Sequence, residues 1–309
     1  MSTHESIVVG VDFTSCSRAA LAHALRLASE SRPPASVRVV HVIDRTVAEE
    51  LASALGGGVD GLASTLTGDA RRRWTEYAAG VPGAASLTFD AVVGGRVGGL
   101  VEQARTAGAD LLVLGAYGDR KPNVGFGSVA AGCVRRAPCD VLLVRENAPA
   151  TFRNVLVATD FSPTSLRAIR RAARLALREQ ATLRVLHVFD APWRQLHYRA
   201  PTPEASPQFQ RTYRDSLERR LRETAMQEVG AVDQGLAARA TVELLDRKGE
   251  RSAIVEAAQR SGADLIVIGT HGRTHLKDLF LGSVAEATIL ESSCSVLAVK
   301  PEEIAGRRS

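Results

Sequence analysis

Short apolar runs alternate with longer segments of mixed polarity along the whole chain. In the first half, these runs predict strands at residues 7–11, 36–43, 86–93, 111–115 and 141–145. The first run is apolar throughout, which is typical of a parallel strand that helices cover on both faces. Strands that alternate with helices favour an open, doubly wound parallel sheet with right-handed crossovers, of the Rossmann-like α/β class.

Helices are predicted between these strands. An apolar stripe on a polar background predicts a first helix that ends near residue 30, and later helices at 97–107 and 127–136. The segment 47–80 is also helical in character, but the glycines at 56–58 and Gly61 interrupt it. This segment is therefore predicted to hold a broken helix.

The second half repeats this order of elements. Strands are predicted at residues 155–158, 182–189, 237–245, 265–269 and 296–300. Helices are predicted at 163–178, 208–229 and 249–260 and from 283 onward, with a proline-rich loop at 191–210. Ser162 before a proline is a good helix N-cap. Each half is thus expected to form its own five-stranded parallel sheet.

The two halves also match residue by residue. IVVGVDF at 7–13 corresponds to VLVATDF at 155–161, VVHVID at 39–44 to VLHVFD at 185–190, GADLLVLG at 108–115 to GADLIVIG at 262–269, and CDVLLVR at 139–145 to CSVLAVK at 294–300. A period of about 150 residues is far too long for a solenoid and predicts a tandem domain duplication. We place the domains at residues 1–146 and 151–302, on either side of a short turn-forming linker.

A glycine-rich loop follows the fourth strand of each half. In the second half it reads GTHGRTHLKDLFLGS over residues 269–283, with glycines spaced as G-x2-G-x9-G-S. Glycines let a backbone approach an anion closely and adopt positive φ. The helix that follows offers unpaired N–H groups and the positive end of its dipole. Arg273, His275 and Lys277 add positive charge, so the pattern predicts a phosphate cradle. Glycines that only make turns would leave the same pattern.

These residues carry a family resemblance, because each half resembles a universal stress protein domain. The marks are an aspartate after the first strand, His-Val near the end of the second strand, and the glycine loop after the fourth. The resemblance covers nearly the whole chain as a tandem two-domain protein, and it implies the ATP-binding branch of the family. Carried over by position, it implies nucleotide contacts in the second half from Asp160, Val188, Gly269, Gly272, Gly282, Ser283 and Val284.

The first half departs from this pattern in its glycine loop. Eight residues rather than nine separate Gly118 from Gly127, and Asp119 and Pro122 enter the loop, although Arg120 and Lys121 keep positive charge there. The shortened loop leaves open whether this half binds nucleotide. The corresponding candidates are Asp12, Val42, Gly115, Gly118, Gly127 and Ser128.

Composition narrows the class of protein. The chain has 309 residues, of which 45% are hydrophobic and 24% charged, which is typical of a soluble protein with two ordinary domains. We expect a cytoplasmic protein, because no apolar stretch reaches membrane-spanning length and no secretion signal is evident. The four cysteines lack metal-ligand spacing and are predicted to be buried thiols; a redox role for Cys16, near a helix start, stays open.

Charge and short motifs exclude several other functions. The net charge is +5, but the arginine runs at 71–73 and 219–222 are interleaved with glutamates on predicted helices, so no nucleic-acid site is expected. A phosphate loop of the GxxxxGK[ST] type is absent, and GFGSVA at 125–130 lies too far past its strand for a dinucleotide fingerprint. His271 and His275 have no third ligand in view, so no metal site is predicted. No catalytic set recurs in both halves.

Three classes of function stay open at this stage. The first is an ATP-binding regulatory protein of the stress response, with Mg²⁺ or Mn²⁺ as an open companion of the nucleotide and an unidentified protein partner. The second is a slow ATPase or nucleotidyl-transferring enzyme, and the third is an interaction scaffold that binds no nucleotide. The resemblance also implies that the last strands, 141–145 and 296–300, pair as in a dimer of single domains. A homodimer of the whole chain stays open.

Overall fold

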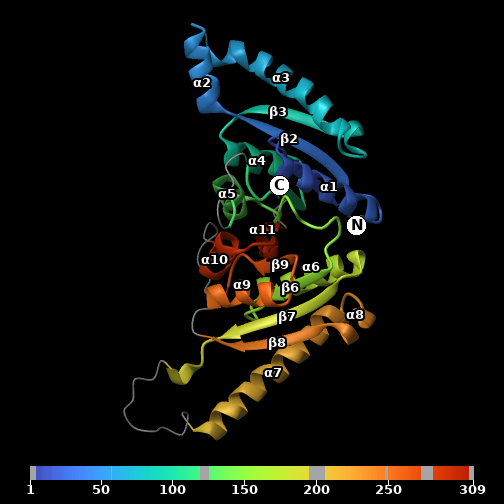
Figure 1. The fold of residues 1–309 in the computed structure, drawn as a ribbon, viewed down its shortest axis with the longest axis vertical. Helices are drawn as coiled ribbons and strands as arrows, with labels where there is room; N and C mark the ends of the chain where they lie inside the picture. The colour runs from blue at the N-terminus through green and yellow to red at the C-terminus, as the bar shows by residue number, and fades with distance from the viewer. Residues whose placement is uncertain are drawn as a thin grey trace.

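The computed structural model describes residues 5–56, 58–118, 125–194, 206–247, 250–272 and 281–305. Figure 1 shows two similar α/β halves stacked along the long axis of the molecule. The elements of the first half are β1 (Ser6–Gly10), α1 (Ser15–Glu30), β2 (Ser36–Asp44), α2 (Arg45–Ala54), α3 (Val59–Ala79), η1 (Ala84–Ser86), β3 (Thr88–Gly94), α4 (Arg96–Thr106), β4 (Leu111–Gly115), α5 (Ser128–Arg136) and β5 (Asp140–Val144).

The second half follows the same plan. Its elements are β6 (Asn154–Ala158), α6 (Pro163–Glu179), β7 (Thr182–Phe189), η2 (Pro192–Arg194), α7 (Pro207–Gly230), α8 (Gln234–Arg239), β8 (Thr241–Asp246), α9 (Glu250–Arg260), β9 (Leu265–Gly269), α10 (Ser283–Glu291), β10 (Ser295–Val299) and α11 (Glu302–Ala305). Ser162 caps α6 through its side chain, with a proline in the first turn, as predicted.

The structure differs from two predictions of secondary structure in detail. The segment 47–80 holds two helices, α2 and α3, which separate between Ala54 and Val59 as expected, but Gly61 lies inside α3 and does not interrupt it. The strand predicted at 237–245 begins only at Thr241, because the residues before it form the short helix α8. The Asp233 side chain caps this helix by accepting from the Leu236 N–H at 2.6 Å. Apolar residues on both sides of Ala240 made the helix and the strand look like one run.

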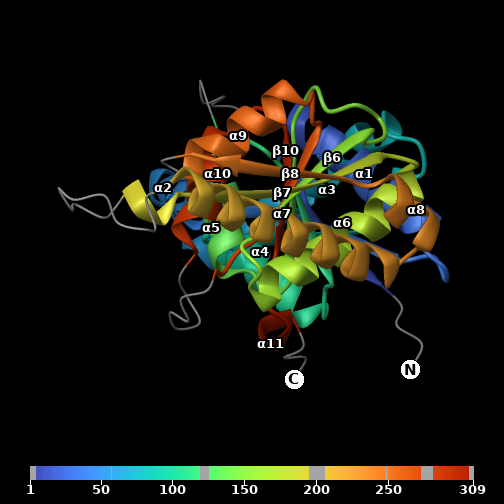
Figure 2. The same cartoon turned by 90° about the horizontal axis from the view of Figure 1, so that it is seen from below.

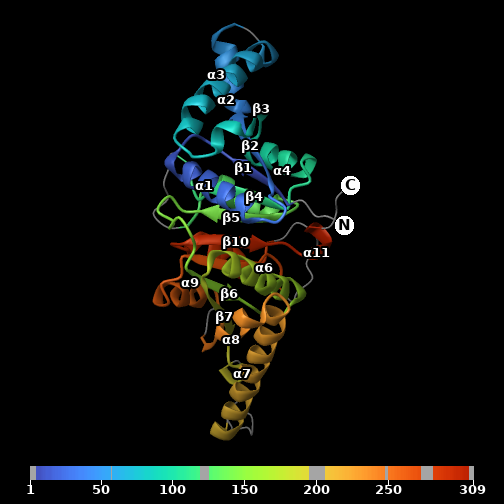
Figure 3. The same ribbon diagram turned by 90° about the vertical axis from the view of Figure 1, so that its right-hand side faces the viewer.

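All ten strands form one continuous sheet in the order β3-β2-β1-β4-β5-β10-β9-β6-β7-β8. Every pair inside a half is parallel, whereas β5 and β10 pair antiparallel, with Leu142 opposite Leu297. Figure 3 shows these two strands side by side at the middle of the molecule. The last strands therefore pair as the resemblance implied, and the halves are related as two subunits of a dimer would be.

Helices cover both faces of the sheet, because alternate residues of each strand point to opposite faces. One apolar cluster joins the sheet to α1, α3, α6, α7 and α8, and the other joins it to α4, α5, α9 and α10. Along the long axis, α5, α9 and α10 lie to one side and α1, α6 and α8 to the other (Figure 2). Both clusters include residues from both halves, so the core is continuous across the β5–β10 seam.

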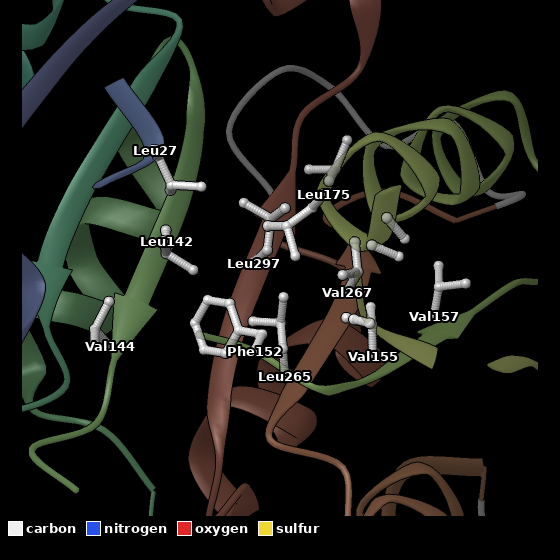
Figure 4. Close-up of a cluster of buried hydrophobic side chains, with 14 of the residues drawn as sticks. Leu27, Leu142, Val144, Phe152, Val155, Val157, Leu175, Leu265, Val267 and Leu297 are labelled. Atoms are coloured by element: carbon white, nitrogen blue, oxygen red, sulfur yellow. The ribbon is translucent and has the colours of Figure 1, made fainter. Parts of the chain in front are cut away.

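The seam on the α1 and α6 face is filled by large apolar side chains (Figure 4). Phe152 is fully buried there and stacks on His23 of α1, with ring centroids 4.6 Å apart. Ion pairs surround this packing: Asp140 is paired with Arg167 at 2.7 Å and with Arg171 at 2.8 Å. The two halves are thus joined by apolar packing and by ion pairs.

Candidate functional site

A pocket of about 200 Å³ opens at the carboxyl ends of β6, β7 and β9. The strand order reverses between β6 and β9, and such a switch point is where open α/β sheets bind ligands. All the residues predicted for the second-half site line this pocket. Its lining comprises Ala158, Thr159, Asp160, Ser165, Val188, Ile254, Ile268, Gly269, His271, Gly272, Gly282, Ser283, Val284 and Ala285.

Backbone amides at the start of α10 form one side of the pocket. Gly282 is the N-cap and has no side chain to cap the helix; its own N–H donates to the Thr270 carbonyl at 2.8 Å. The Glu286 N–H makes the first helical hydrogen bond, to the Gly282 carbonyl at 2.9 Å. The three amides between them, of residues 283–285, lie outside the helical ladder and carry the positive end of the helix dipole.

A single carboxylate, that of Asp160, faces these amides from the end of β6. Its Oδ1 accepts from the Ser162 N–H at 3.0 Å, which forms a tight turn before α6. Within the turn, Phe161 adopts a left-handed conformation, with φ of 64°. The backbone geometry therefore fixes the direction of this carboxylate, and the charge lies opposite a site suited to phosphate.

His187, on the neighbouring strand β7, contacts the turn that follows β6. Its Nδ1 lies 2.7 Å from the Thr159 carbonyl oxygen, and its ring lies 4.5 Å from the Phe161 ring. The first half repeats both contacts: His41 Nδ1 lies 2.8 Å from the Val11 carbonyl oxygen. Sequence analysis used His-Val only as a family mark and missed this role. The recurrence of histidine one residue before a pocket valine in both halves was the signal available.

The floor of the pocket is apolar. Val188, Ile254 and Ile268 are buried, and they belong to the core cluster on the α9 and α10 face. They leave no charged group on this side among the described lining residues. A flat, weakly polar ring such as a nucleobase suits a wall of this kind.

The loop glycines serve close approach rather than unusual backbone conformation. A Cβ at Gly272 would lie 3.0 Å from Asp160 Oδ2, and one at Gly269 would lie 3.1 Å from Thr164 Cγ2. A Cβ at Gly282 would lie 3.3 Å from the Thr270 carbonyl oxygen. None of the three has positive φ, so that part of the expectation was wrong. Arg273, His275 and Lys277 lie outside the described residues.

The first half brings its candidates to the equivalent strand ends. Asp12 Oδ1 accepts from the Thr14 N–H at 3.1 Å, and a Cβ at Gly118 would lie 2.8 Å from Asp12 Oδ2. The Gly127 N–H donates to the Ala116 carbonyl at 2.8 Å, as Gly282 does to Thr270, and α5 begins at Ser128.

The rest of the first-half site is more tightly packed. A Cβ at Gly115 would lie 2.9 Å from the Ser17 backbone nitrogen, so β4 runs directly against α1. A Cβ at Gly99 would lie 2.9 Å from Val42 Cγ1, so α4 packs directly on Val42. The loop residues Asp119, Arg120, Lys121 and Pro122 lie outside the described residues.

The cysteines are structural. Cys16, Cys133 and Cys139 are buried free thiols and Cys294 is partly buried, largely as predicted. Burial raises the pKa of Cys16, which opposes the thiolate that a helix start was expected to favour. The Cys16 sulfur instead accepts from the Ala116 N–H at 3.1 Å and supports the start of the first-half loop.

Across the described ranges, no group of three or more His, Cys, Asp or Glu side chains could hold a metal ion. His271 Nδ1 lies 3.0 Å from the Thr270 hydroxyl, and His275 lies outside the described residues. No helix in the described part of the chain is long and apolar enough to cross a membrane.

Comparison with known proteins agrees with this architecture. A model of the universal stress protein family matches the chain twice, at residues 3–145 and 151–300. The chain belongs to the universal stress protein family. Its fold is that of two tandem universal stress protein domains.

Relatives of single-domain length match one half of this universal stress protein at a time. Universal stress protein A homolog 1 of Coxiella burnetii is 30% identical over 152 residues, which are 49% of this chain and 99% of the relative. A universal stress protein of Methanocaldococcus jannaschii is 29% identical over 154 residues, 50% of this chain and 85% of the relative.

A solved structure matches the full length. The crystal structure of a universal stress protein from Archaeoglobus fulgidus superposes with a TM-score of 0.63 at 18% identity, covering 97% of this chain and 99% of the other. At this identity the likeness shows the fold alone. It agrees with the arrangement of two domains in one chain.

Proposed function

We propose that this universal stress protein binds ATP in the second-half pocket and acts as a nucleotide-responsive regulator with little or no catalysis. Occupancy of the pocket would change the surface around the glycine loop that a partner protein meets. The proposal concerns the second half first, because its described pocket contains the complete set of predicted residues.

The convergence of three unlike surfaces in one pocket carries the proposal. The amides of residues 283–285 suit phosphate oxygens, because they are unpaired by the helix and carry its positive dipole end. The apolar floor at Val188 and Ile254 suits adenine. Asp160 lines the same pocket, and a carboxylate can accept from ribose hydroxyls. Phosphates, ribose and adenine are the three parts of ATP.

A divalent cation would come with the nucleotide rather than reside in the protein. Asp160 is the one carboxylate among the described lining residues, and carboxylate oxygens suit Mg²⁺ or Mn²⁺. Such an ion would be held chiefly by the phosphates, with Asp160 as a direct ligand or through water. The ion would neutralise phosphate charge next to the carboxylate.

We include slow or absent hydrolysis in the proposal, because the described part of the pocket offers few titratable groups that could activate water. Asp160 and His271 are the titratable side chains among the described residues of the pocket. Asp160 already accepts from the Ser162 N–H, and the His271 ring lies against its neighbour Thr270. Rapid turnover that Asp160→Ala abolishes would favour the alternative, an ATPase.

Calorimetric titration with ATP and Mg²⁺ tests the proposal. A denatured sample is examined first for nucleotide that co-purifies with the protein. Ser283→Ala and Gly282→Val are expected to weaken binding, because they remove a hydroxyl donor and crowd the Thr270 carbonyl next to the amides. Ser128→Ala at the equivalent first-half position is the matched control and should leave the second-half site intact.

The stoichiometry separates the alternatives. One equivalent of ATP, lost in the second-half variants alone, supports a nucleotide sensor with an inactive first half. Two equivalents mean that the shortened first-half loop also binds. Absence of both co-purified nucleotide and binding heat at millimolar ATP would refute the proposal and favour an interaction scaffold.

A further inference from the structure

The helices that begin at the two glycine loops meet across the seam. Arg135 of α5 forms an ion pair with Glu286 of α10 at 2.6 Å. The N-terminal ends of these helices face the strand ends of their own halves. Their C-terminal ends are reached by residues of the opposite half.

Arg145, which follows β5 in the first half, reaches the C-terminal end of α10. Its guanidinium donates to the carbonyl of Ser292, the C-cap residue of α10, and its N–H donates to the Ser295 hydroxyl at 3.1 Å. The side chain lies over the Phe126 ring, with Cζ 4.4 Å from the centroid. Arg145 is 8% exposed, so its charge is desolvated and directed at a helix end of opposite partial charge.

Lys300, at the matching position after β10, makes the reciprocal contact. Its Nζ donates to the Arg135 carbonyl in the last turn of α5 at 3.3 Å, and the side chain is 2% exposed. Its N–H donates to Asp140 Oδ1 at 2.9 Å, as that of Arg145 does to Ser295. Each half thus places a buried cation at the C-terminal end of the other half's loop helix. The recurrence argues that the contact is a property of the repeat.

The first-half glycine loop touches the same helix end. Gly125 has φ of 81°, and a Cβ there would overlap with the carbonyl oxygen of Leu290 in the last turn of α10. The ring of its neighbour Phe126 is the one over which the Arg145 guanidinium lies. The end of the first-half loop and the Arg145 side chain therefore both contact the C-terminal end of α10 and restrain its position.

We infer that Arg145 is a positioning residue for the nucleotide pocket of the opposite half. The helix α10 has nine residues and is about 14 Å long, so a fixed C-terminal end determines where its N-terminal amides lie. The cation also stabilises the dipole whose positive end faces the pocket. The inference rests on the proposed function, since the affected quantity is the affinity of the second-half pocket for phosphate-bearing ligands.

Arg145→Met tests this role by calorimetry with ATP and, separately, with adenosine. Met keeps much of the volume but removes the cation and its donor. ATP affinity of the second half is expected to fall about tenfold, within the range of a partly buried charge at a helix end. Adenosine affinity should stay unchanged, because adenosine has no phosphate to contact the amides of α10. Arg145→Lys, which keeps a cation and a donor, should retain most of the ATP affinity.

Arg178→Met is the matched control, since Arg178 pairs with Glu5 across the same seam but on the other face of the sheet. It should leave both affinities unchanged.

Unchanged ATP affinity in Arg145→Met would overturn the inference, and so would equal losses for ATP and adenosine, because a general structural defect affects both. Should Arg145→Met fail to fold, Phe126→Leu removes the ring beneath Arg145 and must show the same selective loss. Failure of the unaltered protein to bind ATP would instead refute the proposed function.

Discussion

Neighbours in the chain help to orient the Asp160 carboxylate, which accepts from the Ser162 N–H. Phe161 turns the backbone through a left-handed conformation, and the His187 ring packs on the Phe161 ring. Arg220 of α7 lies over the Phe161 ring, with Cζ 4.3 Å from the ring centroid. Arg73 makes the equivalent contact with Phe13 at 4.9 Å in the first half. A preformed carboxylate loses little freedom when it binds.

Asp160→Asn is therefore expected to weaken ATP–Mg²⁺ binding about tenfold while leaving stability nearly unchanged. Asparagine keeps an oxygen that can accept from the Ser162 N–H, so the turn is retained. The charge that would meet ribose hydroxyls or a phosphate-bound cation is lost. Calorimetry gives the affinity and thermal unfolding gives the stability, with Asp12→Asn as the control. Stronger binding in Asp160→Asn would mean that the carboxylate only repels phosphate.

At the scale of elements, the sequence repeat was the most informative feature. It predicted the ten strands, their parallel order and the pocket residues, because matched apolar runs and loop glycines recur at one offset. It did not predict the short helix α8, which depends on a local cap at Asp233. It also did not predict the contact of His187 with the Thr159 carbonyl, which joins residues that are distant in the sequence. The lining at Ile254 and Thr159 was likewise missed, because the sequence does not show which side chains surround a cavity.

Helix α1 of the first half contacts residues of the second half through His23 and Arg26. Its His23 is 3% exposed and stacks on Phe152 beside the linker. Its Nδ1 lies 3.1 Å from Arg26 Nη2, and Arg26 pairs with the buried Glu179 of α6 at 2.5 Å. A neutral imidazole is therefore built into the seam.

Stability is expected to fall as the pH is lowered from about 6.5 to about 4, in part through His23. Burial, and then the charge of Arg26, lowers the pKa of His23 from 6.5 to about 4. In that window the unfolded chain holds the proton and the folded chain does not, so protonation favours unfolding, by at most about 3 kcal/mol. Burial raises the pKa of Glu179, which acts with the opposite sign, so urea unfolding of the protein is compared with that of His23→Gln. Identical pH slopes in the two proteins would contradict this assignment.

At the scale of the whole molecule, the continuous sheet makes the two halves one structural unit. The β5–β10 pairing and the apolar clusters on both faces cross the seam without interruption. Phe152 and Leu142 belong to one of these clusters, although they come from opposite sides of the linker. Separating the halves would expose both faces of the seam, so neither half is expected to unfold alone.

The two tryptophans allow this to be measured, because each half has one. Trp74 stacks on Phe89 at 4.9 Å in the first half, and Trp193 lies 5.5 Å from Tyr213 in the second. Single-tryptophan variants, Trp193→Phe and Trp74→Phe, report the first and second half respectively by fluorescence in urea. Each variant should show one transition, at the same midpoint as its own circular dichroism.

ATP at a hundredfold excess over its Kd should raise the free energy of unfolding that both reporters give by about 2.7 kcal/mol, even though the proposed site lies in one half. A shift confined to the Trp193 reporter would mean that the seam does not couple the halves. Phe152→Ala removes the largest buried side chain at the seam, so uncoupling is expected first in this variant.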